Sequence, residues 1–168
     1  VELTDGAYCN YENDPNNVAA YGRLYNWYAV KTGKLCPTGW HESLENEWRT
    51  LENYLIAQGY NYDGTNTEDK IAKAMASSSG WDSYTAEGVI GNTDYPEKQN
   101  ASGFTALPGG YRSIYGEFNF IGIGGYWWTS AESNDSNGYG RDLGNVNRDL
   151  SYGSRGKITG YSVRCVKD

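Results

Sequence analysis

The last third of the chain opens with Gly124-Gly125-Tyr126-Trp127-Trp128-Thr129-Ser130 and closes with Gly160-Tyr161-Ser162-Val163-Arg164-Cys165-Val166. Aromatic and β-branched residues dominate both runs, which is typical of strands. Between them, residues 131–160 are built largely from Asn, Ser, Asp, Gly, Tyr and Arg. We therefore interpret the two runs as scaffold and the polar tract as a surface. Because side chains alternate along a strand, Trp127 and Trp128 face opposite sides, and at least one of them belongs to the core.

Length and composition indicate one domain covering residues 1–168, large enough to bury about two-thirds of its unfolded surface. The chain has 22 Gly, 16 Tyr and 6 Trp, which favours short strands and turns over a helical bundle. Tyr, Ser, Gly and Asn are also the residues that paratopes use, although an ordinary β-rich protein has a similar composition. A net charge of -7 argues against a nucleic-acid partner, and no apolar run is long enough to insert into a membrane.

The first half of the chain predicts two helices. The clearer one covers residues 44–57, where apolar residues recur at helical spacing, with Ser43 as N-cap and Gly59 after its end. Its apolar stripe is Leu44, Trp48, Leu51 and Leu55. A second helix is expected over 67–76, and its buried residues are Ile71, Ala74 and Met75.

The other segments predict loops and strands. Residues 1–17 resemble a polar loop, 21–30 fit either a helix or a strand, and 81–102 indicate an irregular loop with a short strand at most. Strands are expected within 104–112, 126–130, 139–143, 145–148 and 161–166. Helices followed by antiparallel strands predict an α+β domain.

The three cysteines, Cys9, Cys36 and Cys165, lack the spacing of a zinc site. One disulfide and one free thiol are expected if the protein is in an oxidising compartment. The expected pair is Cys36 and Cys165, since both lie in strand-like segments that a closed domain can bring together. Three buried thiols in a cytosolic protein are the alternative.

Catalysis and metal binding have little support in the sequence. His41 is the only histidine, and its position just before a helix favours a structural role. Calcium needs six or more oxygen ligands, and the acids Asp135, Asp142 and Asp149 are scattered. We therefore expect no enzyme activity, no cofactor and no metal.

Five motifs occur in order at residues 21–27, 35–41, 103–112, 125–130 and 162–166. They are Tyr-Gly-Arg-Leu-Tyr-Asn-Trp, Leu-Cys-Pro-Thr-Gly-Trp-His, Gly-Phe-Thr-Ala-Leu-Pro-Gly-Gly-Tyr-Arg, Gly-Tyr-Trp-Trp-Thr-Ser and Ser-Val-Arg-Cys-Val. Together they closely resemble the Fibrobacter succinogenes major paralogous domain. This resemblance implies the formylglycine-generating-enzyme-like branch of the C-type lectin fold, with two helices packed on twisted antiparallel sheets and a loop-rich ligand face. It also implies an extracellular or bacterial cell-surface location.

The chain departs from this family at two places. The family's Pro-Ser pair at the helix start is Ser43-Leu44 here. Family members often carry a second cysteine shortly before the Tyr-Gly-Arg-Leu-Tyr motif, and this chain has none there, so Cys9 lacks its usual partner. Formylglycine-generating enzymes hold copper with paired cysteines, and Cys165 resembles only the structural cysteine of the closing strand. The resemblance therefore gives little support to oxidase activity.

The final third also resembles variable proteins of diversity-generating retroelements, in which mutagenised adenines turn Asn codons into a limited set of residues. The tract Ala131–Gly160 is rich in those residues, including the out-of-character Leu150 and Ile158. An ordinary polar region of the family is the alternative. For the location, a phage-borne protein is the alternative to the bacterial surface.

This resemblance predicts a non-catalytic module that binds a protein or glycan through its C-terminal face. The rival hypothesis is a structural or adhesion domain of a bacterial surface protein without diversification. We expect Arg141 and Arg148 to support strands. The candidate ligand-binding residues are Tyr139, Asp142, Asn145, Asn147, Asp149, Leu150, Tyr152, Ser154, Arg155 and Ile158.

Overall fold

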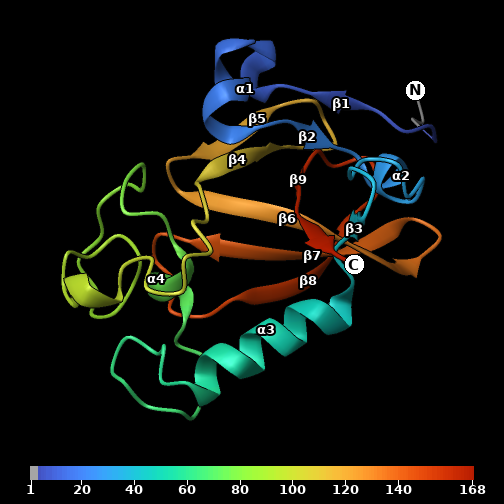
Figure 1. The fold of residues 1–168 in the computed structure, drawn as a ribbon. Helices are drawn as coiled ribbons and strands as arrows, with labels where there is room; N and C mark the ends of the chain where they lie inside the picture. The colour runs from blue at the N-terminus through green and yellow to red at the C-terminus, as the bar shows by residue number, and fades with distance from the viewer. Residues whose placement is uncertain (1–3) are drawn as a thin grey trace.

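A computed structural model describes residues 4–168 as a mixed α+β structure dominated by sheet (Figure 1). Its centre is a six-stranded sheet of order β5-β4-β6-β7-β8, in which β9 pairs with β6. Two small sheets, β1-β2 and β3-β10, flank it. The strands are β1 Tyr8–Cys9, β2 Leu24–Tyr25, β3 Trp40–Glu42, β4 Gly109–Arg112, β5 Phe118–Ile121, β6 Gly124–Asn134, β7 Asn137–Gly144, β8 Ser151–Gly156, β9 Ser162–Val163 and β10 Cys165–Lys167. The helices are α1 Asn16–Tyr21, α2 Trp27–Val30, α3 Glu45–Ala57 and α4 Ala72–Met75, with short 3-10 turns at Tyr11–Asn13 and Pro96–Lys98.

The large sheet is mixed, whereas we had expected wholly antiparallel sheets. Strand β6 runs parallel to β4 and to β9, whereas β6-β7 and β7-β8 are antiparallel. Across the last three strands, Trp127 lies opposite Arg141, and Arg141 lies opposite Tyr152. These three side chains therefore share the face of the sheet that packs on α3.

The two tryptophans of β6 divide the core between the two faces of the sheet, as their alternation predicted. Trp127 packs with Trp48 of α3 and with Phe104, at ring-centroid distances of 6.1 Å and 6.0 Å. Trp128 faces the other side, where it packs with Trp27 and Tyr161. Both indoles are buried, so each face of the sheet has its own apolar core.

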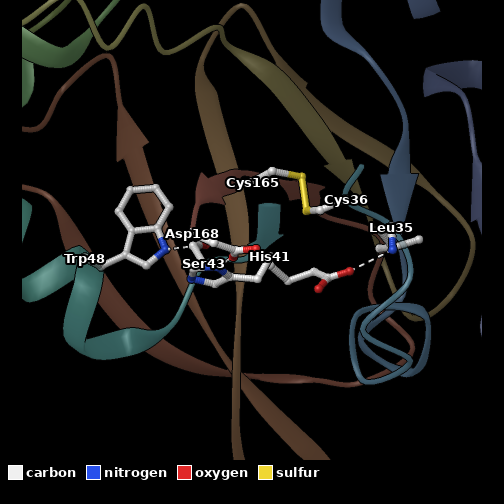
Figure 2. The surroundings of a disulfide bond; sticks show 8 residues. Leu35, Cys36, His41, Ser43, Trp48, Cys165 and Asp168 are labelled. Carbon is white, nitrogen blue, oxygen red and sulfur yellow. Dashed lines mark hydrogen bonds and ion pairs between the residues drawn. A yellow bond between two sulfur atoms is a disulfide. The ribbon is translucent and has the colours of Figure 1, made fainter. Parts of the chain in front are cut away.

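Helix α3 matches the predicted 44–57 segment closely, but its first turn differs. Leu44 is the N-cap residue and is exposed, and its amide donates to the Glu47 carboxylate at 2.7 Å. Ser43, which we expected to cap the helix, instead accepts a hydrogen bond from the indole of Trp48 at 2.8 Å (Figure 2). An acidic side chain at the third helical position therefore replaces the predicted serine cap.

The second predicted helix, 67–76, is reduced to the single turn α4. The side chain of Asn61 donates to the carbonyls of Thr67 and Glu68 and accepts from the amide of Lys70. Glu68 also has a φ of 62°, which no α-helix tolerates. The residues expected to be buried are buried: Ile71, Ala74 and Met75.

Lys73 of α4 is also buried, and it fixes the long segment that we predicted as an irregular loop. Its ammonium donates to the carbonyl of Asn92 at 2.7 Å, to the carbonyl of Asp94 at 2.5 Å and to the Asp94 carboxylate at 2.6 Å. The other oxygen of that carboxylate accepts from the amide of Gly88. Within 81–102 the structure has the 3-10 turn Pro96–Lys98 and no strand.

Residues 131–160 contain the predicted strand 139–143, within β7, but more strand and less loop than the resemblance to a loop-rich ligand face implies. The tract continues β6 to Asn134 and then forms β7 and β8, which pair with each other from Asn137 opposite Gly156 to Asp142 opposite Ser151. Residues 145–148, predicted as a strand, form the turn between β7 and β8. Strand pairing has overridden the low β-propensity of Asn, Gly and Asp in this tract.

The N-terminal segments also contain more regular structure than predicted. Residues 1–17 include β1 and the start of α1, and 21–30 contain both alternatives in succession, β2 and then α2. Asn26 separates these two elements because its side chain accepts from the amide of Ala29 and so caps α2.

The C-terminus is fastened to the first third of the chain (Figure 2). Cys36 and Cys165 form a disulfide with an S–S distance of 1.97 Å, and Cys9 is a free thiol. Strand β10 pairs with β3 directly beside it. His41 of β3 bridges two carboxylates, Asp168 at 2.6 Å and Glu47 at 2.8 Å, and these contacts raise its pKa.

Candidate functional site: an aromatic pocket

A pocket of about 460 Å³ opens on the face of the sheet opposite α3. Strands β4 and β5 contribute Tyr111 and Phe120, and the turn between them adds an exposed rim. Strands β6, β7 and β8 contribute one side chain each, and the chain leading into β9 completes the wall. The lining residues are Tyr111, Ser113, Ile114, Tyr115, Phe120, Tyr126, Asp142, Arg155, Thr159 and Tyr161.

The aromatic wall of this pocket is held by mutual packing. Tyr111 contacts the rings of Tyr126 and Tyr161 edge-on, at centroid distances of 4.9 Å and 5.8 Å. Tyr161 in turn packs on the buried Trp128 at 4.8 Å. Since the rings rest on the core, the wall is pre-formed, as in most small-ligand sites. Tyr115, at the rim, is 84% exposed.

A carboxylate and a guanidinium meet in the pocket. The Asp142 carboxylate accepts from Arg155 at 3.3 Å, and Arg155 also donates to the carbonyl of Ser154. Burial raises the pKa of Asp142, while the charge of Arg155 opposes that rise. Burial also raises the pKa of Tyr161, to about 12, and that of Tyr126. Both tyrosines are therefore neutral phenols at physiological pH, able to donate and accept hydrogen bonds.

Only Asp142 and Arg155 among the ten predicted ligand-binding residues line this pocket. Side chains along β7 and β8 alternate between the two faces of the sheet, and Asp142 and Arg155 point to the pocket face. The opposite face therefore carries Tyr139, Tyr152 and Ser154. There the rings of Tyr139 and Tyr152 stack at 4.8 Å, beside a separate polar hollow of about 320 Å³.

The four residues predicted in the β7-β8 turn are divided between surface and core. Leu150 is 3% exposed and packs in the core beside α3, where its remaining surface lines the polar hollow on that face. Asn145 is also buried, and its side chain donates to the carbonyl of Asp82. Asn147 donates to Ser151, and Asp149 is exposed. Ile158 lies elsewhere, in a hollow of about 40 Å³ beside Cys9.

Arg141 supports the sheet as predicted. It is 3% exposed and forms ion pairs with Glu45 and Glu52 of α3 at 2.6 Å and 2.7 Å, beneath the ring of Tyr152. Arg148 is exposed and donates to the carbonyl of Glu87, so it anchors the turn rather than a strand.

Sequence reasoning missed most of the pocket wall. Tyr126 and Tyr161 were assigned to the scaffold only, and Tyr111, Tyr115 and Phe120 were not selected. The sequence does contain one usable signal for these residues. Successive side chains of a strand point to opposite faces, so Asp142 lies on the pocket face and its two neighbours in the chain lie on the α3 face. The parallel pairing of β4 with β6, which brings the distant Tyr111 to Tyr126, has no local sequence signal.

A family model described as the Fibrobacter succinogenes major domain matches residues 1–167. The chain belongs to this family. No curated protein and no solved structure matches this Fibrobacter succinogenes major domain. Within residues 4–168 of the domain, no helix has the length and apolar character needed to cross a bilayer. The same residues contain no group of three or more His, Cys, Asp or Glu side chains placed to hold a metal ion.

Proposed function

We propose that this Fibrobacter succinogenes major domain is a non-catalytic module that binds a protein or glycan ligand through the aromatic pocket. The supporting observation is the combination of a pre-formed aromatic wall with a carboxylate–guanidinium pair in one concave site. Tyr and Arg are the side chains that supply most binding energy at recognition surfaces. Tyr115 is 84% exposed and adjoins Phe120 and Tyr126 at the pocket, and contiguous exposed apolar surface of this kind is typical of binding sites.

Two observations favour binding over catalysis. His41 is occupied by two carboxylates at the C-terminal end of the chain and does not line the pocket. An oxidase of the formylglycine-generating type requires two cysteine thiolates at one copper ion. Here Cys36 is bonded to Cys165, and Cys9 is the one thiol among residues 4–168.

We further propose a C-type lectin-like architecture and an extracellular or bacterial cell-surface location. One long helix against a twisted sheet, with the chain end tied back by a disulfide, is compatible with that fold. The disulfide supports the location, because such bonds persist in oxidising compartments.

Retroelement-driven diversification is also part of the proposal, but the structure restricts where it can act. Arg141, Leu143, Leu150 and Lys157 lie within the tract and are buried, so random replacement there would damage the fold. Exposed or half-buried positions can vary: Asp135, Asp142, Asp149, Tyr152, Ser154 and Arg155. A near-repeat in the encoding DNA that differs only at adenines would support diversification. Differences concentrated at the buried positions would contradict it.

Binding is tested with the exposed tyrosine of the rim. Tyr115→Ala removes a ring that is 84% exposed, whereas Tyr54→Ala removes a 57% exposed ring from α3, on the other side of the sheet. Wild type and both variants are applied to a glycan array and to a random-peptide display library. We expect at least one ligand that Tyr115→Ala binds about tenfold more weakly, a loss of about 1.4 kcal/mol, and that Tyr54→Ala binds normally. Equal binding by all three proteins would favour the rival structural domain.

A further inference from the structure

We infer that the aromatic pocket takes a neutral saccharide, held by stacking and by direct side-chain hydrogen bonds. This inference rests on the binding function proposed above and names its ligand class.

The wall of the pocket suits one face of a sugar ring. A pyranose has a face of C–H groups and a rim of hydroxyls, so it binds where flat aromatic surface lies beside polar groups. Tyr111, Phe120 and Tyr126 supply such surface inside the pocket, and the exposed Tyr115 extends it at the rim. A volume of about 460 Å³ lies within the range of small-ligand sites.

The polar groups suit neighbouring hydroxyls. Each sugar hydroxyl both donates and accepts, so two adjacent hydroxyls match an acceptor and a donor placed side by side. Asp142 and Arg155 form such a pair, with 3.3 Å between their polar atoms. Hydrogen bonds to these charged groups are stronger than those between neutral groups. The phenol of Tyr126, which also lines the pocket, adds a further donor and acceptor.

The charge of the pocket selects a neutral ligand. Asp142 and Arg155 cancel, and no other charged side chain lines the site. An anionic ligand would compete with Asp142 for Arg155 and would approach a chain of net charge -7. A cationic ligand would compete with Arg155 for Asp142. A neutral polyhydroxyl compound avoids both costs, because it bonds to the pair without displacing either member.

The test uses one printed array that carries neutral, sialylated and sulfated glycans. The domain is biotinylated and assembled on streptavidin, since multivalency makes weak sites detectable. Wild type, Tyr115→Ala, Asp142→Asn and the control Tyr54→Ala are compared at equal concentration, with thermal unfolding recorded for each. The random-peptide library is screened in parallel with the same four proteins.

We expect neutral glycans to bind wild type and Tyr54→Ala, and to lose at least tenfold in affinity with Tyr115→Ala and with Asp142→Asn. Equal or stronger binding of sialylated or sulfated glycans would overturn the neutral class. Tyr115-dependent binding of peptides without any glycan would overturn the saccharide and leave the binding function standing. No Tyr115-dependent ligand of either class would overturn both proposals. Because Tyr115 is exposed, these outcomes do not depend on whether Asp142→Asn folds.

Discussion

Replacing Lys73 with Met is expected to lower the free energy of unfolding by about 1–3 kcal/mol, the usual cost of leaving buried polar groups without their hydrogen-bond partner. The Lys73 side chain is 1% exposed, and its ammonium serves the carbonyls of Asn92 and Asp94 as well as the Asp94 carboxylate. Methionine keeps the volume but leaves these three acceptors without their donor. Unsatisfied buried acceptors lose their solvation with no compensating bond.

The measurement is urea unfolding followed by far-UV circular dichroism, with the slope m checked for each variant. Lys34→Met is the matched control, because Lys34 is exposed and forms no ion pair within residues 4–168. Asp94→Asn and the double variant with Lys73→Met complete a cycle that isolates the pairwise term, expected at about 0.5–3 kcal/mol. Amide exchange at Gly88, whose N–H donates to Asp94, reports on the loop itself.

The pH dependence gives a second check on Lys73. Burial acts to raise the pKa of Asp94, but hydrogen bonds from Lys73 and the amide of Gly88 bring it below its ordinary value. A lowered folded-state pKa stabilises the protein above the unfolded value of 3.8 and loses that effect as the pH falls. The difference between wild type and Lys73→Met should therefore shrink below about pH 4. A loss under about 1 kcal/mol at pH 7 would refute the view that Lys73 organises the loop.

Three further substitutions test other contacts. Replacing both Cys36 and Cys165 with Ser should lower the free energy of unfolding by up to about 5 kcal/mol, since the bond closes a loop with a sequence separation of 129; urea unfolding that is unchanged by the double substitution would contradict this. Arg141→Met leaves two carboxylates of α3 facing each other without their shared cation, and calorimetry should show a melting temperature lower by several degrees. The control Arg49→Met removes an exposed cation of α3 itself and should change the melting temperature little. Because the hydrogen bonds that His41 donates to two carboxylates raise its pKa, its stabilisation is complete below about pH 6.5 and is lost as the pH rises through the folded-state value. The urea midpoint of wild type should exceed that of His41→Gln more at pH 5.5 than at pH 8.5, and a constant difference would count against the bridge.

Elements with a strong local period were predictable from the sequence. Helix α3 has a regular apolar stripe, and the division of Trp127 and Trp128 follows from strand geometry alone. The helix expected over 67–76 failed for a reason that no local pattern contains. The side chain of Asn61, several residues away, takes up the backbone groups that would have formed its first turn.

The candidate site was predictable only in part. Composition pointed to the polar tract, and the tract does supply Asp142 and Arg155 to the pocket. Within the tract, strands were predicted only at 139–143 and 145–148, whereas β6 continues into it and β7 and β8 fill most of the rest, because pairing with neighbouring strands decides the structure of residues with low β-propensity. Once the tract is seen as strands, alternation assigns Tyr139 and Tyr152 to the α3 face and explains why the ten residues do not share one site.

The disulfide also determines how the domain would respond to a pulling force. Tension applied between the two ends of residues 1–168 passes from Cys36 directly to Cys165, so the intervening polypeptide bears none of it. At about 3.5 Å per residue, full extension of the remaining chain yields about 140 Å, against about 590 Å for the reduced protein. The pocket lies wholly within the shielded segment. The strands that line the pocket would therefore bear no tension until this one bond is reduced. Unfolding of the N-terminal segment would nevertheless withdraw Trp27 and Val30 from the core beneath Tyr161, so the pocket would lose its support before it bore load.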